Sequence, residues 1–573
     1  MLKIKKLYTE PEIIDPINFH DGVNLILGEK DESSNKTNGV GKSLCVEFIN
    51  FALLKKASDS RVKRIPKEIF PLETYVCLEV LIADEPVTIK RSMKNAERPV
   101  FIFNERSIEF QKLEDATSYL REKVFVHDRV SPSFRSMMGL LIRDERSEFK
   151  SLVGCYDTSK KVPDDYAPHL YLLGINIEIY AAIKAVINDI DELTKHIKKM
   201  KDNVELLRQK GLDDARSDMN ELESEVEEIS RSIEALENIS GYEFVKEDII
   251  ALEKNLDDLR REKSILRTKY LRTKLITDAG RIDSNEVGEF YEQMRKGLGN
   301  HVKRELDEVY EFKKKIDDFQ NQLIHQKREE IEEQIRDIDS KLNVLDEKYR
   351  SKLMVLDHQG ELKNLKQTYF AYQSKLDEVG QLKAFISKYD EFSLQKQRAR
   401  AKKEQDLLTL QSAIQQSSST LNSLKGTMLK AHEYIQGNRR ASFEIKTTTK
   451  KQIVEMTMRI DDDGSHSVER EKVFIYDICL LLDDKISALH PGFLIHDNIF
   501  DVDQDTLNKS LDYLVNEVEF GSKQYILTLN ADRLENAIVD PELLAHLKPT
   551  VRASYTKVEG GRFIKAKYQE VQK

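Results

Sequence analysis

The chain is poor in the residues that interrupt helices or cross-link small domains. It contains 12 Pro, 22 Gly, 4 Cys and no Trp among 573 residues, whereas 34% of its residues are charged. Few helix breakers and many charges are typical of a chain dominated by solvated helix, which argues against a compact enzyme domain alone. The cysteines lie far apart with no CxxC pair. This excludes a recognisable zinc site or disulfide framework and indicates reduced thiols.

Long apolar runs and an excess of positive charge are also missing. The N-terminus has no apolar run long enough for a signal peptide, and no stretch approaches the ~20 apolar residues of a membrane span. We therefore expect a soluble, cytoplasmic protein with no membrane partner. Because the formal net charge is −10, any contact with nucleic acid would depend on a local basic stripe.

The pattern of apolar residues divides the chain into two α/β segments and a helical middle. Residues 1–176 alternate short apolar runs such as VNLIL with turns, and residues 431–573 contain the strand-like runs FLIHD and QYILTLN. Each of these segments alone is an incomplete domain. We therefore expect them to fold together into one α/β head.

The middle of the chain has the apolar spacing of a coiled coil. Apolar residues recur at alternating steps of three and four over 177–271, the predicted outgoing arm, and again over 305–430, the predicted returning arm. Residues 272–304 lose this repeat and collect four glycines, so they are the predicted apex. A long antiparallel hairpin would bring the two flanking segments together. A parallel dimeric stalk is the alternative.

The sequence KTNGVGKS has the composition of a phosphate-binding loop, although Lys36 stands where the usual spacing has glycine. It follows an apolar strand that ends at Gly28 and precedes a predicted helix. The backbone of such a loop and the helix N-terminus bind phosphates, while the lysine reaches the β and γ phosphates and the serine holds Mg²⁺. We therefore predict ATP and Mg²⁺ as ligands; a chance match in an ordinary loop is the alternative. The predicted contacts are Lys36, Asn38, Gly39, Val40, Gly41, Lys42 and Ser43.

The aspartate that ends the run FLIHD, Asp497, is the predicted carboxylate partner of this loop. A magnesium site of this kind takes a carboxylate from the end of a neighbouring hydrophobic strand. The N-terminal segment offers no good candidate, so the coiled coil would have to fold back to bring Asp497 to Ser43. A residue that merely caps a turn is the alternative interpretation of Asp497.

A phosphate loop near one end, an acidic strand end near the other and a folded-back coil between them resemble the Rad50/SMC branch of the ABC ATPases. The resemblance covers essentially the whole chain in architecture but is specific only in short motifs. MGLLIRDERSEF resembles the Q-loop region, with Asp144 where a glutamine is expected and able to approach Mg²⁺. GSHSVEREK occupies the place of the signature motif without its double glycine. By this resemblance, Ser465 or Ser467 would touch the γ-phosphate bound by a partner protomer.

Two departures from that family concern the attacking water. The family places a glutamate after the strand aspartate and a histidine after the next strand, where this chain has Asn498 and Asn530. An amide can position water but cannot accept its proton. We therefore expect an ATPase whose hydrolysis is slow, depends on a partner, or uses Asp501 or Asp503 in the D-loop-like segment.

The resemblance also implies partners. It predicts a homodimer joined through ATP-bound heads and contact with double-stranded DNA. HPGFLIHDN and QYILTLN look closest to an uncharacterised group of bacterial Rad50-like ATPases, similar to the ATPase components of three-component ABC defence operons. The chain would then control a separately encoded effector, with a nuclease as one candidate, together with an accessory subunit. The alternatives are a DNA repair ATPase acting with a nuclease and an ATP-stabilised scaffold without DNA binding.

Basic residues in the N-terminal segment are the candidates for phosphate contacts with DNA. They are Arg61, Lys63, Arg64 and Arg91. The same segment has about as many acids as bases, so an ordinary solvated face is the alternative, and Arg91 has a structural role in a strand as its own alternative. The apex lacks the CxxC zinc hook of Rad50, so any contact there would be between proteins without metal.

Overall fold

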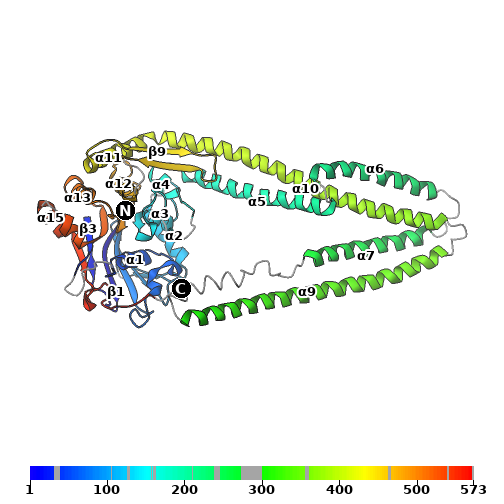
Figure 1. The fold of residues 1–573 in the computed structure, drawn as a ribbon, viewed down its shortest axis with the longest axis horizontal. Coiled ribbons are helices and arrows are strands. Elements are labelled where there is room, and N and C mark those ends of the chain that lie inside the picture. Colours follow the sequence, from blue (N-terminus) through cyan, green and yellow to red (C-terminus); the bar gives the residue numbers. More distant parts are fainter. Residues whose placement is uncertain are drawn as a thin grey trace. The chain divides into compact units, whose positions relative to one another are not determined.

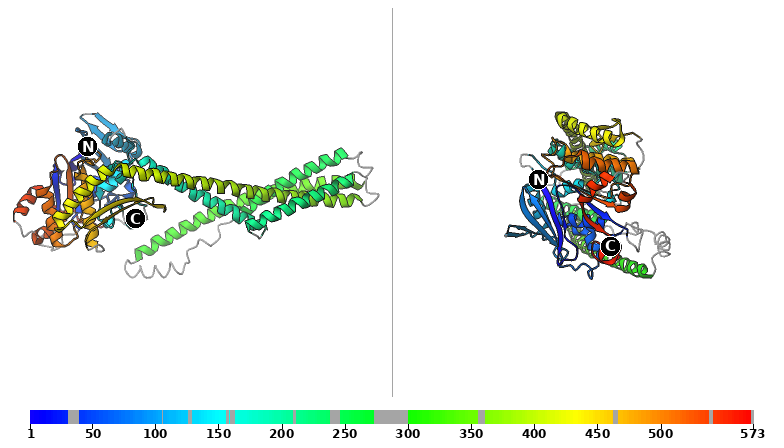
Figure 2. Two further views of the ribbon diagram at one scale, coloured as in Figure 1. Left: turned by 90° about the horizontal axis from the view of Figure 1, so that it is seen from above. Right: turned by 90° about the vertical axis from the view of Figure 1, so that its left-hand side faces the viewer.

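The computed structural model divides the chain into two units. It describes residues 1–30, 39–104, 106–125, 129–155, 158, 163–208, 211–237, 246–272, 300–354, 361–461, 466–537 and 541–570. Residues 1–195 and 393–573 form one unit, which we call the head, and residues 196–392 form the second, which we call the coil unit. Strands from both ends of the chain, blue and red in the ribbon, lie side by side in the head (Figures 1 and 2).

The first layer of the head is an antiparallel sheet made only of N-terminal residues. In spatial order its strands are β2 (Ile17–Asn18), β1 (Leu2–Glu10), β4 (Tyr75–Ile82), β5 (Glu85–Ser92), β6 (Val100–Phe103) and β7 (Arg106–Glu109). Buried positions alternate along most of β4 and β5, because one face of the sheet packs on the core. A short hairpin, β9 (Ser442–Thr447) with β10 (Val454–Arg459), lies elsewhere in the head.

The second sheet is parallel and interleaves the two ends of the chain. Its spatial order is β13 (Val551–Tyr555), β3 (Gly22–Gly28), β12 (Gln524–Asn530), β11 (Phe493–Asp497) and β8 (Ile142–Arg143). Every residue of β11 is buried, as expected for a parallel strand covered on both faces. Because N-terminal β3 pairs with C-terminal strands on both sides, neither end of the chain can form this sheet alone.

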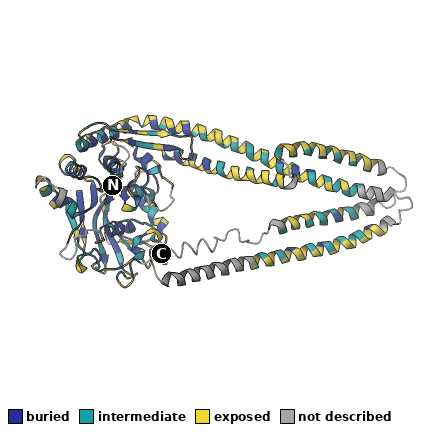
Figure 3. Cartoon of the chain, in the orientation of Figure 1, coloured by how far each residue is buried: buried dark blue, intermediate teal, exposed yellow. Residues whose placement is uncertain are grey.

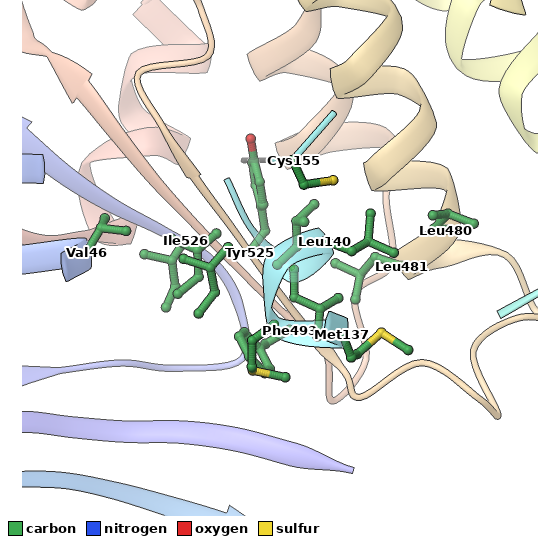
Figure 4. Packing of buried hydrophobic residues seen from close by; sticks show 14 of the residues in the cluster. Val46, Met137, Leu140, Cys155, Leu480, Leu481, Phe493, Tyr525 and Ile526 are labelled. Carbon is green, nitrogen blue, oxygen red and sulfur yellow. The ribbon is translucent and has the colours of Figure 1, made fainter. Parts of the chain in front are cut away.

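Helices cover both faces of the parallel sheet. The head helices are α1 (Lys42–Ala52), α2 (Leu113–Val124), α3 (Phe134–Leu141), α4 (Ala167–Leu172), α11 (Ser418–Gln436), α12 (His466–Leu482), α13 (Gln504–Asp512), α14 (Ala531–Ala537) and α15 (Pro541–Leu547). Helix α1 packs against both sheets, whereas α12 packs against β11. Val46, Ile526 and Leu481 belong to one core cluster, which Figure 4 shows from close by.

A buried ion pair fastens the edge strand β8 to this core. Arg143 Nε lies 2.5 Å from Asp477 Oδ2 of α12, and both side chains are almost entirely removed from solvent. Asp477 also contacts His496 Nε2 of β11 at 3.0 Å. Arg143 holds the pKa of Asp477 below its usual value, against the effect of burial. The residues that follow Arg143 therefore leave the sheet at a well-defined place.

The coil unit is built from antiparallel helix pairs. Its helices are the second half of α5 (Ile177–Arg208), α6 (Leu212–Glu237), α7 (Lys246–Arg272), α9 (Asn300–Met354) and the first part of α10 (Glu361–Gln416). Glu223 of α6 pairs with Lys383 and Glu225 with Lys375, so the partner numbers fall as the α6 numbers rise. Helices α7 and α9 pair in the same sense, through Arg260 with Asp346 and Tyr270 with Glu332.

Narrow apolar seams hold these pairs together. Val204, Leu222 and Leu382 form one seam between α5, α6 and α10, and Leu256 packs on Tyr349 between α7 and α9. Figure 3 shows that most other coil positions are exposed or half-buried. The predicted fold class, an α/β head assembled from both ends with an antiparallel coiled-coil insertion, is confirmed.

The structure gives the bounds of the head and describes only the ends of the predicted apex. The head includes the first turns of α5 and the last turns of α10, because Ile183 and Leu410 belong to its core. It is therefore larger than the predicted segments 1–176 and 431–573. Most of the predicted apex, residues 273–299, lies outside the described part of the chain. Over the described residues, no helix has both the length and the apolar character needed to cross a membrane.

Candidate functional site

The phosphate loop stands between β3 and α1. Gly41 caps α1 with φ of 111°, and Gly39 has φ of +80°. Side chains are disfavoured at such angles, and a Cβ on Gly41 would also approach Cβ of Phe563 to 2.5 Å. Glycine is therefore required at position 41 for two reasons. The predicted contacts Lys36 and Asn38 lie outside the described residues.

The parallel sheet brings the two predicted halves of the site together. In a parallel sheet all strands end at the same edge, so Gly28 of β3 and Asn530 of β12 are register partners, and Asp497 ends β11 beside them. Ser43 Oγ, in the first turn of α1, donates to Asp497 Oδ1 at 3.1 Å across 454 residues of sequence. Lys42 Nζ donates to Asn530 Oδ1. These residues thus form one cluster within a single protomer.

Asp497 is held by a residue that sequence reasoning missed. Thr528 Oγ1 donates to Asp497 Oδ1 at 2.6 Å and accepts the backbone N–H of Asn498 at 3.0 Å. Burial raises the pKa of Asp497 to about 6, while the hydrogen bonds from Thr528 and Ser43 oppose this rise. A signal for Thr528 exists in the strand register, because Thr528 of β12 is the partner of Asp497 in the last residue pair of the two strands.

Lys42 is the buried cation of the site. Lys42 is 7% exposed, and burial lowers the pKa of its amine. The carboxylates of Asp497, Asp532 and Glu145 raise this pKa and so oppose the effect of burial. Carboxylates on several sides therefore compensate a desolvated charge. A phosphate group bound beside Lys42 would do the same.

A pair of acids follows β8 at the same edge of the sheet. Asp144 accepts the backbone N–H of Arg146 through Oδ1 at 3.1 Å, and burial raises the pKa of its carboxyl. Its neighbour Glu145 accepts a hydrogen bond from Asn498 Nδ2 at 3.2 Å. Sequence reasoning singled out Asp144 and passed over Glu145, although both belong to the same short run. The two candidates Asp144 and Asn498 do lie at the site.

Two cavities adjoin this cluster. The larger, of about 410 Å³, is lined by the loop from Gly39 to Leu44, by Glu145 and Asn498, and by part of the C-terminal segment. The second, of about 390 Å³, is lined by Ser43, Asp144, Glu145 and Asp497 among others. One cavity is thus on the phosphate-loop side and the other on the carboxylate side.

The C-terminal segment is part of the site and was not predicted. Phe563 N donates to the carbonyl of Val40 at 3.2 Å, and Arg562 Nη1 donates to the carbonyl of Gly39 at 3.2 Å. Glu570 pairs with Arg61 at 2.5 Å. No sequence motif marks these residues, because their role follows only from where the chain returns.

The predicted signature and D-loop residues lie apart from these cavities. Ser465 is outside the described residues, and Ser467 lies in the first turn of α12. Asp501 pairs with Arg533 at 3.2 Å, and Asp503 caps α13 by accepting from Thr506 N at 2.9 Å. The described residues that line the two cavities do not include Ser467, Asp501 or Asp503.

The predicted DNA contacts have different environments. Arg91 is 0% exposed and donates to the carbonyls of Phe51, Lys55 and Ala96, so its assignment to DNA is wrong and it is a structural residue. Its inward position in β5 agrees with the alternative interpretation of Arg91 as a structural strand residue. Arg61 pairs with Glu570 beside the larger cavity, Arg64 contacts the same carboxylate at 3.5 Å, and Lys63 is exposed.

Two family models match separate parts of the chain. Residues 8–240 match a family model described as an AAA domain, and residues 429–554 match one described as an uncharacterised protein conserved in bacteria (DUF2326). The AAA match contains the phosphate loop and the second match contains Asp497. The two halves of the site therefore fall in different matches.

Comparison with individual proteins gives similar but distant relatives. The chain is 22% identical over 566 residues to the uncharacterized protein YydD of Bacillus subtilis (strain 168), covering 93% of this chain and 94% of that protein. It also aligns with the Smc head domain with a coiled coil and joint from Pyrococcus yayanosii (13% identity, 94% of each chain, TM-score 0.35). A second alignment is with the Smc head domain of Pyrococcus furiosus bound to the C-terminal domain of ScpA (10% identity, 94% and 92%, TM-score 0.35).

Proposed function

We propose that the head binds ATP with Mg²⁺ and hydrolyses it. The contact between Ser43 and Asp497 is the observation that supports this most directly, because it joins the first turn of α1 to the carboxylate at the end of β11. Lys42 would contact the β and γ phosphates, and the backbone of Gly39 to Gly41 would surround them. Asn530 holds the Lys42 amine on the side of β12.

The oxygen donors present are suited to magnesium. Mg²⁺ in nucleotide sites is held by one or two carboxylates together with phosphate oxygens and water, and Ser43, Asp497 and Asp144 line one cavity. In the part of the chain that the structure describes, no group of three or more His, Cys, Asp or Glu side chains could hold a metal ion without other ligands. Phosphate oxygens and water would therefore complete the magnesium site. When bound, Mg²⁺ would neutralise charge on the phosphates. Thr528 keeps Asp497 oriented for that role.

Replacing the loop lysine tests nucleotide binding. We expect Lys42→Ala to weaken ATP affinity about 10- to 100-fold, since a hydrogen bond between charged groups is lost. Isothermal titration with ATP and Mg²⁺ measures this change, and Lys63→Ala, at an exposed lysine outside the cavities, is the matched control. Unchanged affinity in the Lys42 variant would refute the assignment of the loop.

We further propose that ATP joins two heads into a homodimer. Ser467 lies in the first turn of a 17-residue helix, and it does not line the described cavities of its own protomer. A helix N-terminus favours an anion, so this turn is suited to the γ-phosphate bound by the other head. Light scattering of the chain with ATP should show a doubled mass that Ser467→Arg prevents.

DNA contact and a role in defence are the finer part of this proposal. We propose that the joined heads bind double-stranded DNA, with Lys63 as an exposed basic residue of the head, and that a separately encoded effector responds. A salt titration of duplex binding, with and without ATP, tests the DNA step. Binding that is absent or independent of nucleotide would favour an ATP-stabilised scaffold. Co-purification with the products of neighbouring genes tests for an effector or a repair nuclease.

A further inference from the structure

Asn498 stands where the related family has the glutamate that accepts the proton of the attacking water, and its side chain contacts Glu145. Resting on the ATPase function proposed above, we infer that Glu145 takes the proton from the water that attacks ATP, and that Asn498 positions the Glu145 carboxylate. The contact between Asn498 Nδ2 and Glu145 Oε1 at 3.2 Å carries this inference. The acid and the amide would then divide a task that a single strand-end glutamate could perform.

The backbone brings Glu145 to the site. Ile142 and Arg143 of β8 pair in parallel with Ile495 and His496 of β11, so both strands run toward the same edge. The chain leaves β8 directly into the 3-10 turn that begins at Glu145. This acid therefore reaches the edge at which Asp497 ends β11.

Asn498 is itself held firmly. Its φ of 60° lies in the left-handed region, its backbone N–H donates to Thr528 Oγ1 at 3.0 Å, and its carbonyl accepts from Arg470 Nη1 at 3.0 Å. An unusual backbone angle persists where the surroundings determine it. The side chain consequently presents its N–H group to Glu145 from a fixed position.

The other acids around the two cavities have structural partners. Among the described residues, these acids are Glu47, Asp144, Asp497 and Glu570. Glu47 pairs with Lys55, and Glu570 pairs with Arg61. Asp144 accepts a backbone N–H, and Asp497 accepts two hydroxyl groups. Glu145 instead accepts from a neutral amide, is exposed, and lines both cavities.

The chemical step follows from these positions. The water oxygen forms a bond to the γ phosphorus, the bond from that phosphorus to the bridging oxygen breaks, and its electron pair stays on ADP. The water proton passes to the Glu145 carboxylate and then to solvent, so ATP and water give ADP, phosphate and a proton. Lys42 stabilises the charge that develops on the phosphates.

Moving the carboxylate tests this assignment. We expect Glu145→Gln to lower the single-turnover hydrolysis rate about 100-fold or more, in line with the usual contribution of a general base, while ATP affinity changes less than about threefold. In Glu145→Gln/Asn498→Glu the acid and amide exchange places, and we expect part of the rate to return. Glu148→Gln, which alters an exposed acid outside both cavities, is the matched control.

The following results would contradict the inference. An unchanged rate in Glu145→Gln, or no hydrolysis by the unaltered chain in a single turnover, removes the proton acceptor but leaves the binding proposal standing. A loss of ATP affinity as large as that of Lys42→Ala would make Glu145 a binding residue instead. Failure of the exchanged pair to recover any rate would also count against a shared role for Asn498.

The C-terminal segment carries a second, independent inference. We propose that residues 562–570 form the wall that receives the base and ribose of the nucleotide. Phe563 anchors this wall, because its ring packs on Phe48 with centroids 5.0 Å apart and its backbone bonds to Val40. Beyond this anchor, Ile564, Ala566 and Tyr568 line the larger cavity together with the phosphate loop.

The wall has the chemistry that a nucleoside requires. An aromatic ring and two aliphatic side chains suit the flat face of a base, because stacking on an aromatic residue tolerates any base. Glu570 closes the far end of the segment through Arg61, and Arg562 bonds to the loop carbonyl of Gly39. Both ends of the wall are therefore attached to the same surface that would hold the phosphates.

Comparison of ATP with inorganic tripolyphosphate separates this wall from the loop. We expect Tyr568→Ala to weaken ATP binding about tenfold and tripolyphosphate binding less than about twofold, with Lys567→Ala as the exposed neighbouring control. Ala566→Trp, which fills the cavity, should likewise exclude ATP and spare tripolyphosphate. Equal losses for both ligands, or no loss of ATP binding in either variant, would refute the wall while leaving the phosphate site intact.

Discussion

The head and the coil unit are stabilised in different ways. The head has one continuous core in which two sheets and their covering helices bury whole strands, whereas the described residues of the coil unit form three small seams along paired helices. Large apolar side chains such as Val344, 53% exposed, are tolerated on the coil. Charged groups also differ, since Asp477 is buried in the head, whereas a coil ion pair such as Glu223 with Lys383 is exposed. Burial therefore sets the cost of losing a charge partner.

The strongest test of this difference removes one ion-pair partner from each unit. Asp477→Ala leaves Arg143 and His496 buried without their carboxylate, and we expect it to destabilise the head by about 3–5 kcal/mol. Asp390→Ala removes the exposed partner of Arg216 in the coil unit, where the cost should be about 0–1 kcal/mol. Hydrogen exchange of β11 and of α6 measures the two effects. Similar losses in both units would contradict the comparison.

A cavity in the coil seam should act locally. Leu382 is 1% exposed and packs with Val204 and Leu222, so Leu382→Ala should cost about 2–5 kcal/mol. We expect faster hydrogen exchange in α6 and α10 with no change in ATP affinity of the head. Leu408→Ala, at an exposed position, should alter neither quantity. A parallel fall in ATP affinity would show that the units depend on each other.

The buried carboxylate of Asp497 should lower the stability of the nucleotide-free head. Burial raises the pKa of Asp497 from 3.8 to about 6, so between these values the folded head binds a proton that the unfolded chain has released. Its contribution to stability is therefore largest at low pH and is lost as pH rises toward 6. We expect Asp497→Asn to stabilise the nucleotide-free head by roughly 2–3 kcal/mol at pH 7 and little at pH 4.

Chemical denaturation at both pH values measures this effect, and ATP titration should show that the same variant loses magnesium-dependent binding. Asp505→Asn, on the exposed first turn of α13, provides a control that should leave the pH profile unchanged. A variant that is less stable at pH 7 would mean that the Ser43 and Thr528 hydrogen bonds outweigh the burial of the charge.

Sequence reasoning reached the parts of the molecule that depend on local pattern. The glycines of the loop, the apolar strand before Asp497 and the heptad repeat each have a spacing that follows from one element alone. It failed at Arg91, because a strand alternates inward and outward and a basic side chain can be turned into the core when backbone carbonyls accept its N–H groups. Glu145 was missed for a related reason, since its position at the site depends on the pairing of β8 with β11.

Local pattern thus determined the elements of this protein: a phosphate loop, an acidic strand end and a helical hairpin. Tertiary structure alone decided which residues meet at the site, because β8, β11 and the C-terminal segment reach the loop only through strand register and chain return. The proposed roles of Glu145 and Tyr568 both depend on that meeting. Residues so far apart along the chain share no sequence repeat, so the sequence pattern cannot predict that they are in contact.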